Sequence, residues 1–183
     1  NYFSSNTASV SGTGTGNDTL SNFESIATDS GNDTFIIDSG VGTVTLISRL
    51  GDDVFDFDNA SGTLTLVDSA GNTFLDFTDY TEAIDIDLSS SSAQNVNVSG
   101  TLTLTLTGTF NNLSGTDFAD NVIGTTTDDV IYGGADNDII NGNAGADSLF
   151  GEAGDDTIIG GAGDDILTGG AGNDDLDGGA DTD

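Results

Sequence analysis

The stretch GTDFADNVIGTTTDDVIYGGADNDIINGNAGADSLFGEAGDDTIIGGAGDDILTGGAGNDDLDGGADTD, residues 115–183, repeats every nine residues. Glycine opens all eight units, and position eight is aliphatic in the seven complete ones. The single apolar position predicts one short strand per unit, and the glycine-rich positions before it predict a turn. Position six is always aspartate: Asp120, Asp129, Asp138, Asp147, Asp156, Asp165, Asp174 and Asp183.

Two units make a coil of 18 residues, so turns that are two units apart are expected to stack at the strand spacing, about 4.8 Å. The aspartates then form two columns, one on each edge of the stack. The first column holds Asp120, Asp138, Asp156 and Asp174, and the second holds Asp129, Asp147, Asp165 and Asp183.

Carboxylates stacked this closely repel one another unless a cation lies between them. Carboxylate and carbonyl oxygens select Ca²⁺, and the chain has no histidine or cysteine for a softer metal. The gaps within the two columns give about six ions. The alternative interpretation of the stretch is an acidic, glycine-rich linker that stays solvated.

The segment GGAGDDILTGGAGNDDL (160–176) resembles the repeats of the RTX (repeats-in-toxin) family without a gap. The resemblance implies a parallel β-roll with Ca²⁺ between stacked turns, bound by position-six aspartates and backbone carbonyls of positions one to four. It extends the candidate ligands to Gly133, Gly134, Gly142, Gly145, Gly151, Gly154, Gly160, Gly161, Gly163, Gly169, Gly170 and Gly172. The match is looser at Asn143, Glu152 and Asp136, which replace glycines, and the first two units keep only the opening glycine and the aspartate.

Upstream, residues 28–87 align with a period of 20 residues. Each period contains two short strands of alternating polarity, which is typical of half-buried strands. The first strands align at Phe35, Phe55 and Leu75, and the second strands at Val44, Leu64 and Ile84. We therefore predict an all-β, right-handed parallel β-solenoid with essentially no helix, in which irregular coils (1–114) continue into the calcium roll (115–183).

Asp33 and Asp53 occupy the position-six place of stacked turns in these coils, so they are candidates for a further ion. Turn-capping aspartates without metal are the alternative. Thr73 follows in the third coil and should end the column. GTGND (14–18) is one isolated turn of the same kind, either a half-site or an entry coil.

Residues 88–100 predict a looped-out turn or a shortened coil, and TLTLTLT (101–107) predicts a strand. Thr-x-Thr pairs recur at 43/45, 63/65 and 101–107, and such arrays on β-solenoids resemble ice-binding surfaces. Threonine is also simply a good polar residue for an exposed strand. Ala83 and Asp85 are expected to break the threonine ladder in the third coil.

The composition is dominated by 32 acidic residues against one base, Arg49, giving a net charge of −31. This charge excludes direct binding to nucleic acid or anionic membranes, and no apolar run is long enough to insert into a bilayer. A chain of this charge should order only when cations occupy its turns. The absence of histidine, cysteine and lysine argues against an enzyme.

Three functions remain open. The favoured one is a calcium-binding structural segment of an extracellular bacterial surface, matrix, adhesin or filament protein, with end-to-end self-association. The others are the accessory region of a type I-secreted toxin or hydrolase, and a polysaccharide- or ice-binding face. Calcium modules of low affinity work outside the cell. The chain ends six residues into a unit, so we expect it to be a piece of a longer protein.

Overall fold

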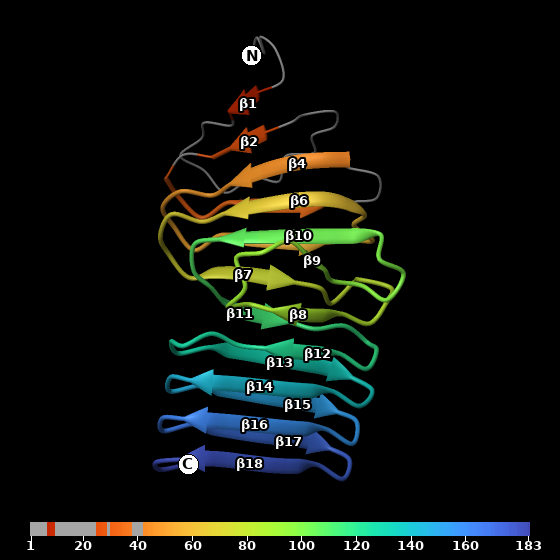
Figure 1. The fold of residues 1–183 in the computed structure, drawn as a ribbon, viewed down its shortest axis with the longest axis vertical. Coiled ribbons are helices and arrows are strands. Elements are labelled where there is room, and N and C mark those ends of the chain that lie inside the picture. Colours follow the sequence, from red (N-terminus) through yellow and green to blue (C-terminus); the bar gives the residue numbers. More distant parts are fainter. Residues whose placement is uncertain (1–6, 10–24, 29, 38–41) are drawn as a thin grey trace.

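The computed structural model describes residues 7–9, 25–28, 30–37 and 42–183, and these form a stack of β-coils with the C-terminal end at the bottom (Figure 1). Because the described ranges contain no helix, they also contain none long and apolar enough to cross a membrane. The all-β parallel solenoid predicted from the sequence is confirmed. The GTGND turn at 14–18 lies outside the described residues.

Three sheets form the walls of the stack. The first sheet contains, in spatial order, β1 (Thr7–Ser9), β2 (Ser25–Ala27), β4 (Gly42–Ile47), β6 (Gly62–Val67), β10 (Leu102–Thr107) and β9 (Gln94–Asn95). The second contains β17 (Ile166–Ala171), β15 (Ser148–Ala153), β13 (Val130–Ala135), β11 (Phe110–Ser114), β7 (Thr73–Asp76), β5 (Val54–Phe57) and β3 (Thr34–Ile37). The third contains β18 (Asp175–Ala180), β16 (Thr157–Ala162), β14 (Ile139–Ala144), β12 (Asn121–Ile123) and β8 (Asp85–Asp87).

The chain alternates between two walls, so each nonapeptide supplies one strand and every second unit stacks in register. In the second sheet Ile131 pairs with Leu149, which pairs with Leu167. In the third sheet Val122 pairs with Ile140. The second sheet runs through the 20-residue coils and the nonapeptide roll alike, since β11 pairs with both β7 and β13.

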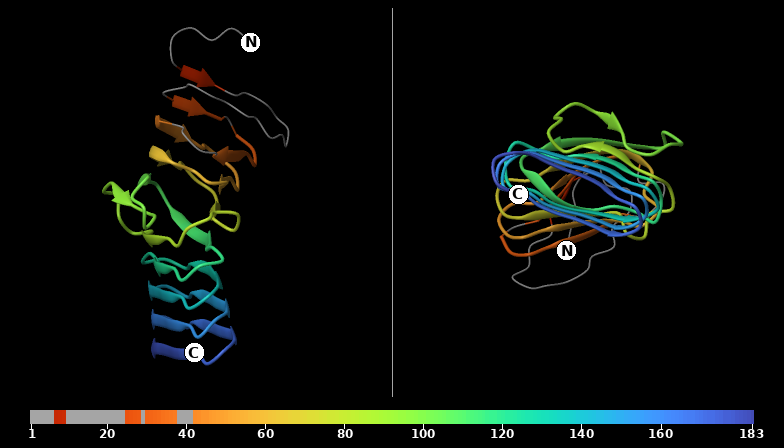
Figure 2. Two further views of the ribbon diagram at one scale, coloured as in Figure 1. Left: turned by 90° about the vertical axis from the view of Figure 1, so that its right-hand side faces the viewer. Right: turned by 90° about the horizontal axis from the view of Figure 1, so that it is seen from below.

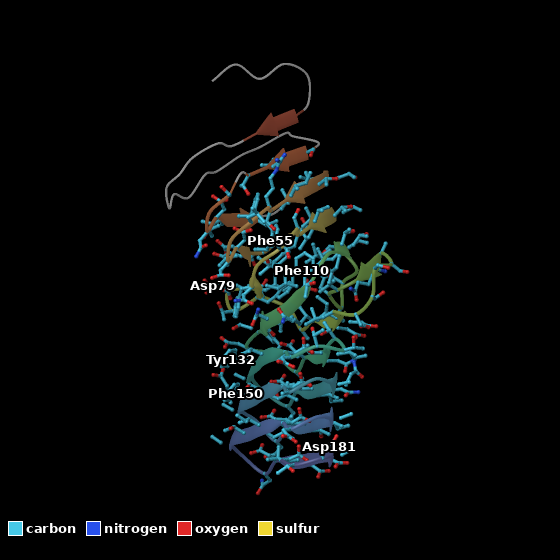
Figure 3. All side chains as sticks on the ribbon, turned by 90° about the vertical axis from the view of Figure 1, so that its left-hand side faces the viewer. Phe55, Asp79, Phe110, Tyr132, Phe150 and Asp181 are labelled. Carbon is cyan, nitrogen blue, oxygen red and sulfur yellow. The ribbon has the colours of Figure 1, made fainter. Side chains whose placement is uncertain are left out.

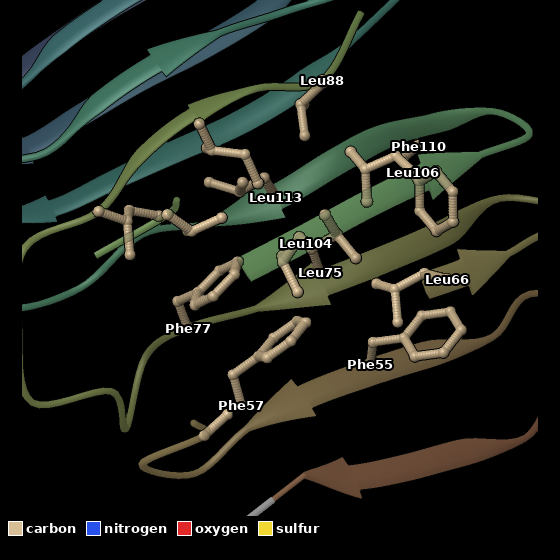
Figure 4. Packing of buried hydrophobic residues seen from close by; sticks show 14 of the residues in the cluster. Phe55, Phe57, Leu66, Leu75, Phe77, Leu88, Leu104, Leu106, Phe110 and Leu113 are labelled. Carbon is tan, nitrogen blue, oxygen red and sulfur yellow. The ribbon is translucent and has the colours of Figure 1, made fainter. Parts of the chain in front are cut away.

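The core is a ladder of inward side chains, because alternate residues of each strand face the interior. Phe55 and Phe57 are fully buried on either side of Asp56. Phe57 stacks on Phe77 with ring centroids 4.2 Å apart (Figure 4). Phe35 stacks on Phe55 with ring centroids 4.8 Å apart. In the roll each unit contributes only one aliphatic side chain to this ladder. The turns must therefore contribute more of the stability there than in the 20-residue coils.

The predicted alignment of the third 20-residue coil is wrong in its second half. Ile84 does not follow Leu64; instead Leu104 of β10 pairs with Leu64, and β8 begins the third sheet by pairing with β12. The reason is the length of the apolar face, because β10 pairs six residues with β6 whereas β8 spans only three.

Residues 88–100 form the looped-out excursion that the sequence predicts, and it projects to one side of the stack as the yellow-green segment around β9 (Figure 2). Its strand β9 pairs antiparallel with β10 and so covers the edge of the first sheet. The buried Asn97 holds the base of the loop, where its side-chain oxygen accepts a hydrogen bond from the Leu102 amide at 2.9 Å.

Candidate metal centres

The turns of the roll owe their shape to positions two and four of each unit. Position four has φ of 138° at Gly145 and 137° at Gly163, a conformation that favours glycine. Where glycine is replaced, the backbone keeps its positive φ, at 68° for Asp136, 71° for Asn143 and 75° for Glu152. These three residues tolerate a strained conformation that costs roughly 1–3 kcal/mol each, so the turn geometry is preserved through them.

From Asp138 to Asp183, each position-six aspartate ties its turn to the turn one coil earlier. Its Oδ1 accepts a hydrogen bond from the backbone amide of the aspartate 18 residues before it. The donor and acceptor residues and distances are Asp120 to Asp138, 2.8 Å; Asp129 to Asp147, 2.8 Å; Asp138 to Asp156, 2.9 Å; Asp147 to Asp165, 2.9 Å; Asp156 to Asp174, 3.1 Å; and Asp165 to Asp183, 3.1 Å. The two predicted columns of aspartates are therefore brought together as expected.

In four of these carboxylates the second oxygen is buried and has no hydrogen-bond partner. These oxygens are the Oδ2 atoms of Asp138, Asp147, Asp156 and Asp165. Each lies against the position-one glycine of its own unit, so that a Cβ on that glycine would overlap it; these glycines are Gly133, Gly142, Gly151 and Gly160. We call the space beside each of these glycines a cradle.

Backbone oxygens complete the cradles. At Gly133, a Cβ would overlap Asp138 Oδ2 and would lie 2.9 Å from the Gly151 carbonyl oxygen. At Gly142, a Cβ would overlap Asp147 Oδ2 and would lie 2.8 Å from the Gly160 carbonyl oxygen. Among the residues that the structure describes, no three acidic side chains cluster closely enough to hold a metal alone. A cation here would therefore be shared between carboxylate and carbonyl oxygens, which is the hard donor set that Ca²⁺ takes. The residues present fit this ion.

Burial disfavours the ionised form of these carboxylates when no cation neutralises the charge. It raises the pKa of Asp138 to about 7 and that of Asp147 to about 6, with stacked neighbours such as Asp120 and Asp156 adding to the shift at Asp138. Burial likewise raises the pKa of Asp120, Asp129 and Asp156. Near neutral pH a carboxyl in a cradle thus takes up a proton or requires a cation.

The first two units differ, because a threonine at position two donates hydrogen bonds to both oxygens of the position-six aspartate. The Thr116 amide donates to Asp120 Oδ2 at 2.7 Å and its hydroxyl to Oδ1 at 2.9 Å. Thr125 contacts Asp129 in the same way, at 2.6 and 2.9 Å. Both aspartates are therefore satisfied within the protein. Sequence reasoning missed these hydroxyls, although threonine four residues before the aspartate was visible in both units.

Asp33 and Asp53 repeat the bond of the roll in the 20-residue coils. The Asp33 amide donates to Asp53 Oδ1 at 2.8 Å, and the Oδ2 atoms of both residues are buried without partners. Asp53 itself is fully buried. The sequence had placed these two residues at position six, and the structure brings them together.

Two aromatic side chains of the roll face outward. Tyr132 and Phe150 stack along the outer side of the second sheet with ring centroids 4.8 Å apart (Figure 3). Phe118 lies in a turn and is 42% exposed.

The family model of the RTX calcium-binding nonapeptide repeat, which describes four copies of the repeat, matches the chain twice, at residues 114–149 and 150–183. Residues 114–183 are therefore similar to the RTX calcium-binding nonapeptide repeats, and their strands form the parallel β-roll that the resemblance predicts. Comparison with curated proteins found no match to the chain.

Proposed function

We propose that this chain is a non-catalytic, calcium-rigidified segment of an extracellular bacterial surface, matrix, adhesin or filament protein. The observation that supports it is the set of four buried, unpartnered Oδ2 atoms, each aimed into a glycine cradle beside backbone carbonyls. We propose that Asp138, Asp147, Asp156 and Asp165 supply carboxylates to ions in these cradles. Asp174 and Asp183 extend the two columns, and the position-one, position-two and position-four glycines supply carbonyls or space.

The free energy of calcium binding would contribute directly to the folding of this segment. The roll contains 17 acidic residues and no base between 114 and 183, so charge repulsion opposes the compact state. An ion that binds only the folded turns shifts the equilibrium towards the fold. A segment of this kind stays unfolded where calcium is scarce and becomes rigid outside the cell, where calcium is near millimolar.

A structural role is favoured over an accessory repeat of a toxin or hydrolase because the solenoid continues upstream. The second sheet contains β3, β5 and β7 from the 20-residue coils as well as the roll strands. This continuity makes one long rod, which suits a stalk or filament. An accessory region needs only the roll.

The test is a calcium titration of the chain, followed by far-UV circular dichroism and sedimentation velocity. We expect a cooperative coil-to-β transition near millimolar calcium, abolished when Asp156→Ala and Asp165→Ala are combined. Sedimenting species that grow with calcium would support the matrix or filament role, whereas a folded monomer would favour the accessory region. A β-rich spectrum that a chelator leaves unchanged would contradict the proposal.

A second function is favoured by the outer face of the first sheet. The break that Ala83 and Asp85 were expected to make does not occur in this sheet, because β10 rather than β8 stacks on β6. Three strands therefore present two in-register columns, which are Thr43, Thr63 and Thr103, and Thr45, Thr65 and Thr105.

This regular array of methyl and hydroxyl groups lacks charge and aromatic rings, which favours ice over polysaccharide as the flat ligand. Thr65→Asp and Thr105→Asp should together abolish inhibition of ice recrystallisation, while Thr157→Asp on the third sheet should not. Binding to insoluble polysaccharide but not to ice would support the other ligand. Binding to neither would remove this second function.

A further inference from the structure

Three stacked turns in the 20-residue coils repeat the backbone of the RTX turns, although the family match begins only at residue 114. Gly31, Gly51 and Gly71 have φ of 141°, 135° and 137°, close to the 137° of the position-four Gly163. A Cβ on Gly51 would overlap the Gly31 carbonyl, as one on Gly163 would overlap that of Gly145. The upstream turns therefore stack as the turns of the roll do.

Their side chains differ from the roll at the position that forms the cradle. Position six is Asp33, Asp53 and Thr73 in the three successive turns. Position one, which is glycine throughout the roll, here bears a side-chain oxygen: Thr28, Ser48 and Asp68. The space that glycine leaves open for an ion in the roll is thus lined by hydroxyl and carboxylate groups upstream.

Unpartnered buried oxygens mark these turns as clearly as they mark the roll. In the described part of the chain, eight buried side-chain oxygens lack a hydrogen-bond partner, and every one belongs to position one or six of a turn. Four are the roll aspartates, and the other four are Thr28 Oγ1, Asp33 Oδ2, Asp53 Oδ2 and Thr73 Oγ1. Leaving a buried polar atom without a partner destabilises the folded state, so this concentration of unpartnered oxygens points to a ligand that completes their coordination.

Asp53 is the centre of the group. Its side chain is fully buried, and its Oδ1 accepts the Asp33 amide. The buried Ser48 hydroxyl donates to Asp68 Oδ1 at 3.2 Å, and Ser48 and Asp68 both lie close enough to the Asp53 carboxylate to influence it, Asp68 through its charge. Arg49, the only basic residue in the chain, is exposed, so it does not neutralise the buried Asp53 carboxylate.

We propose that Asp53, with Asp33 and Ser48, forms a Ca²⁺ site in the 20-residue coils, outside the RTX repeats. It differs from the roll sites in its donors, because side-chain oxygens at position one take the place of the glycine cradle. Only hard oxygen ligands converge here, which selects Ca²⁺ over softer metals. The site rests on the proposed calcium-dependent folding but is separable from the ions of the roll.

The experiment is a count of bound calcium per chain by native mass spectrometry, made on the 183-residue chain and its variants at saturating calcium. Asp53→Asn should bind one ion fewer than the wild type, because the amide keeps an acceptor for the Asp33 amide but loses the charge. Ser48→Ala should weaken the same ion by about tenfold or more. Asp52→Asn removes an equal charge from an exposed neighbour and should leave the count unchanged.

Asp156→Asn separates the two claims, because it should remove a roll ion and leave the Asp53 ion in place. An unchanged ion count in Asp53→Asn, alongside a loss in Asp156→Asn, would overturn this site alone. A wild type that binds no calcium would overturn the proposed function as well. If Asp53→Asn loses its β-spectrum, Ser48→Ala decides, and unaltered affinity in that variant would overturn the site. An Asp53 carboxyl that stays protonated in saturating calcium, seen by ¹³C NMR, would also overturn it.

Discussion

Gly151 shows why the repeat begins with glycine even though its φ is not positive. A Cβ there would overlap Asp156 Oδ2 and lie close to the Gly169 carbonyl oxygen. Gly151→Ala should therefore fill one cradle, weakening one calcium ion by at least about tenfold and costing about 1–3 kcal/mol through overpacking. Calcium titration by calorimetry measures the loss. Ala153→Ser, an exposed change in the same strand, is the control, and equal affinity in the two variants would contradict the cradle.

The charge of Asp138 should destabilise the fold without calcium and stabilise it with calcium. Asp138→Asn retains an acceptor for the Asp120 amide but removes a buried carboxylate whose pKa is raised to about 7. At pH 8 the calcium-free variant should be more stable than the wild type, whereas calcium should stabilise it less. Urea denaturation with and without calcium tests both signs. Destabilisation in both conditions would indicate a purely structural aspartate.

At the scale of the strands, the aromatic ladder should stabilise the upstream coils independently of metal. Phe57 is fully buried and stacked on Phe77. Phe57→Ala should cost about 3–5 kcal/mol, with or without calcium, because it leaves a cavity in the core. Phe118→Ala, at a 42% exposed side chain, should cost less than about 0.5 kcal/mol. Thermal denaturation compares the two variants, and a cost at Phe57 that vanishes in calcium would show that the ladder depends on the roll.

The sequence predicted the strands of the roll well because its period never changes, so one register satisfies every aliphatic and every aspartate position. It did not predict which strand follows β6. Both β8 and β10 alternate apolar and polar residues, and only the six-residue pairing of β10 decides between them. The polarity pattern of a single strand does not show which of two strands will pair with a third. For the same reason, the sequence did not show that the threonine columns continue from β6 to β10 without a break.

The candidate metal residues were predictable where they repeat, and less so where partners come from elsewhere. The stacking of Asp33 on Asp53 followed from the 20-residue period. The contact between Ser48 and Asp68 joins two different turns, and nothing in either turn alone indicates it. The threonines that satisfy Asp120 and Asp129 also look like ordinary turn residues until their hydroxyls are placed.

For the molecule as a whole, acid should partly replace calcium. The folded-state pKa of Asp138, about 7, lies above the ordinary 3.8, so the folded state favours the protonated form. Its contribution to stability is present below about pH 4 and is lost as the pH rises towards 7. The calcium-free chain should therefore melt at a higher temperature near pH 4 than near pH 8, as followed by circular dichroism. Asp138→Asn should flatten this dependence, and a melting temperature that rises with pH would contradict it.

The two walls of the solenoid differ in continuity, and this has a mechanical consequence. One wall is a single ladder from β3 to β17, whereas the opposite wall is divided between the first and third sheets, with β9 and the excursion at the division. A rod built in this way resists stretching along the wall formed by the second sheet. On the opposite wall the hydrogen-bonded ladder is interrupted between the first and third sheets, and we call this interruption the notch. Under lateral load we expect the rod to flex at the notch, so that the segment would act as a stiff strut with one elastic joint.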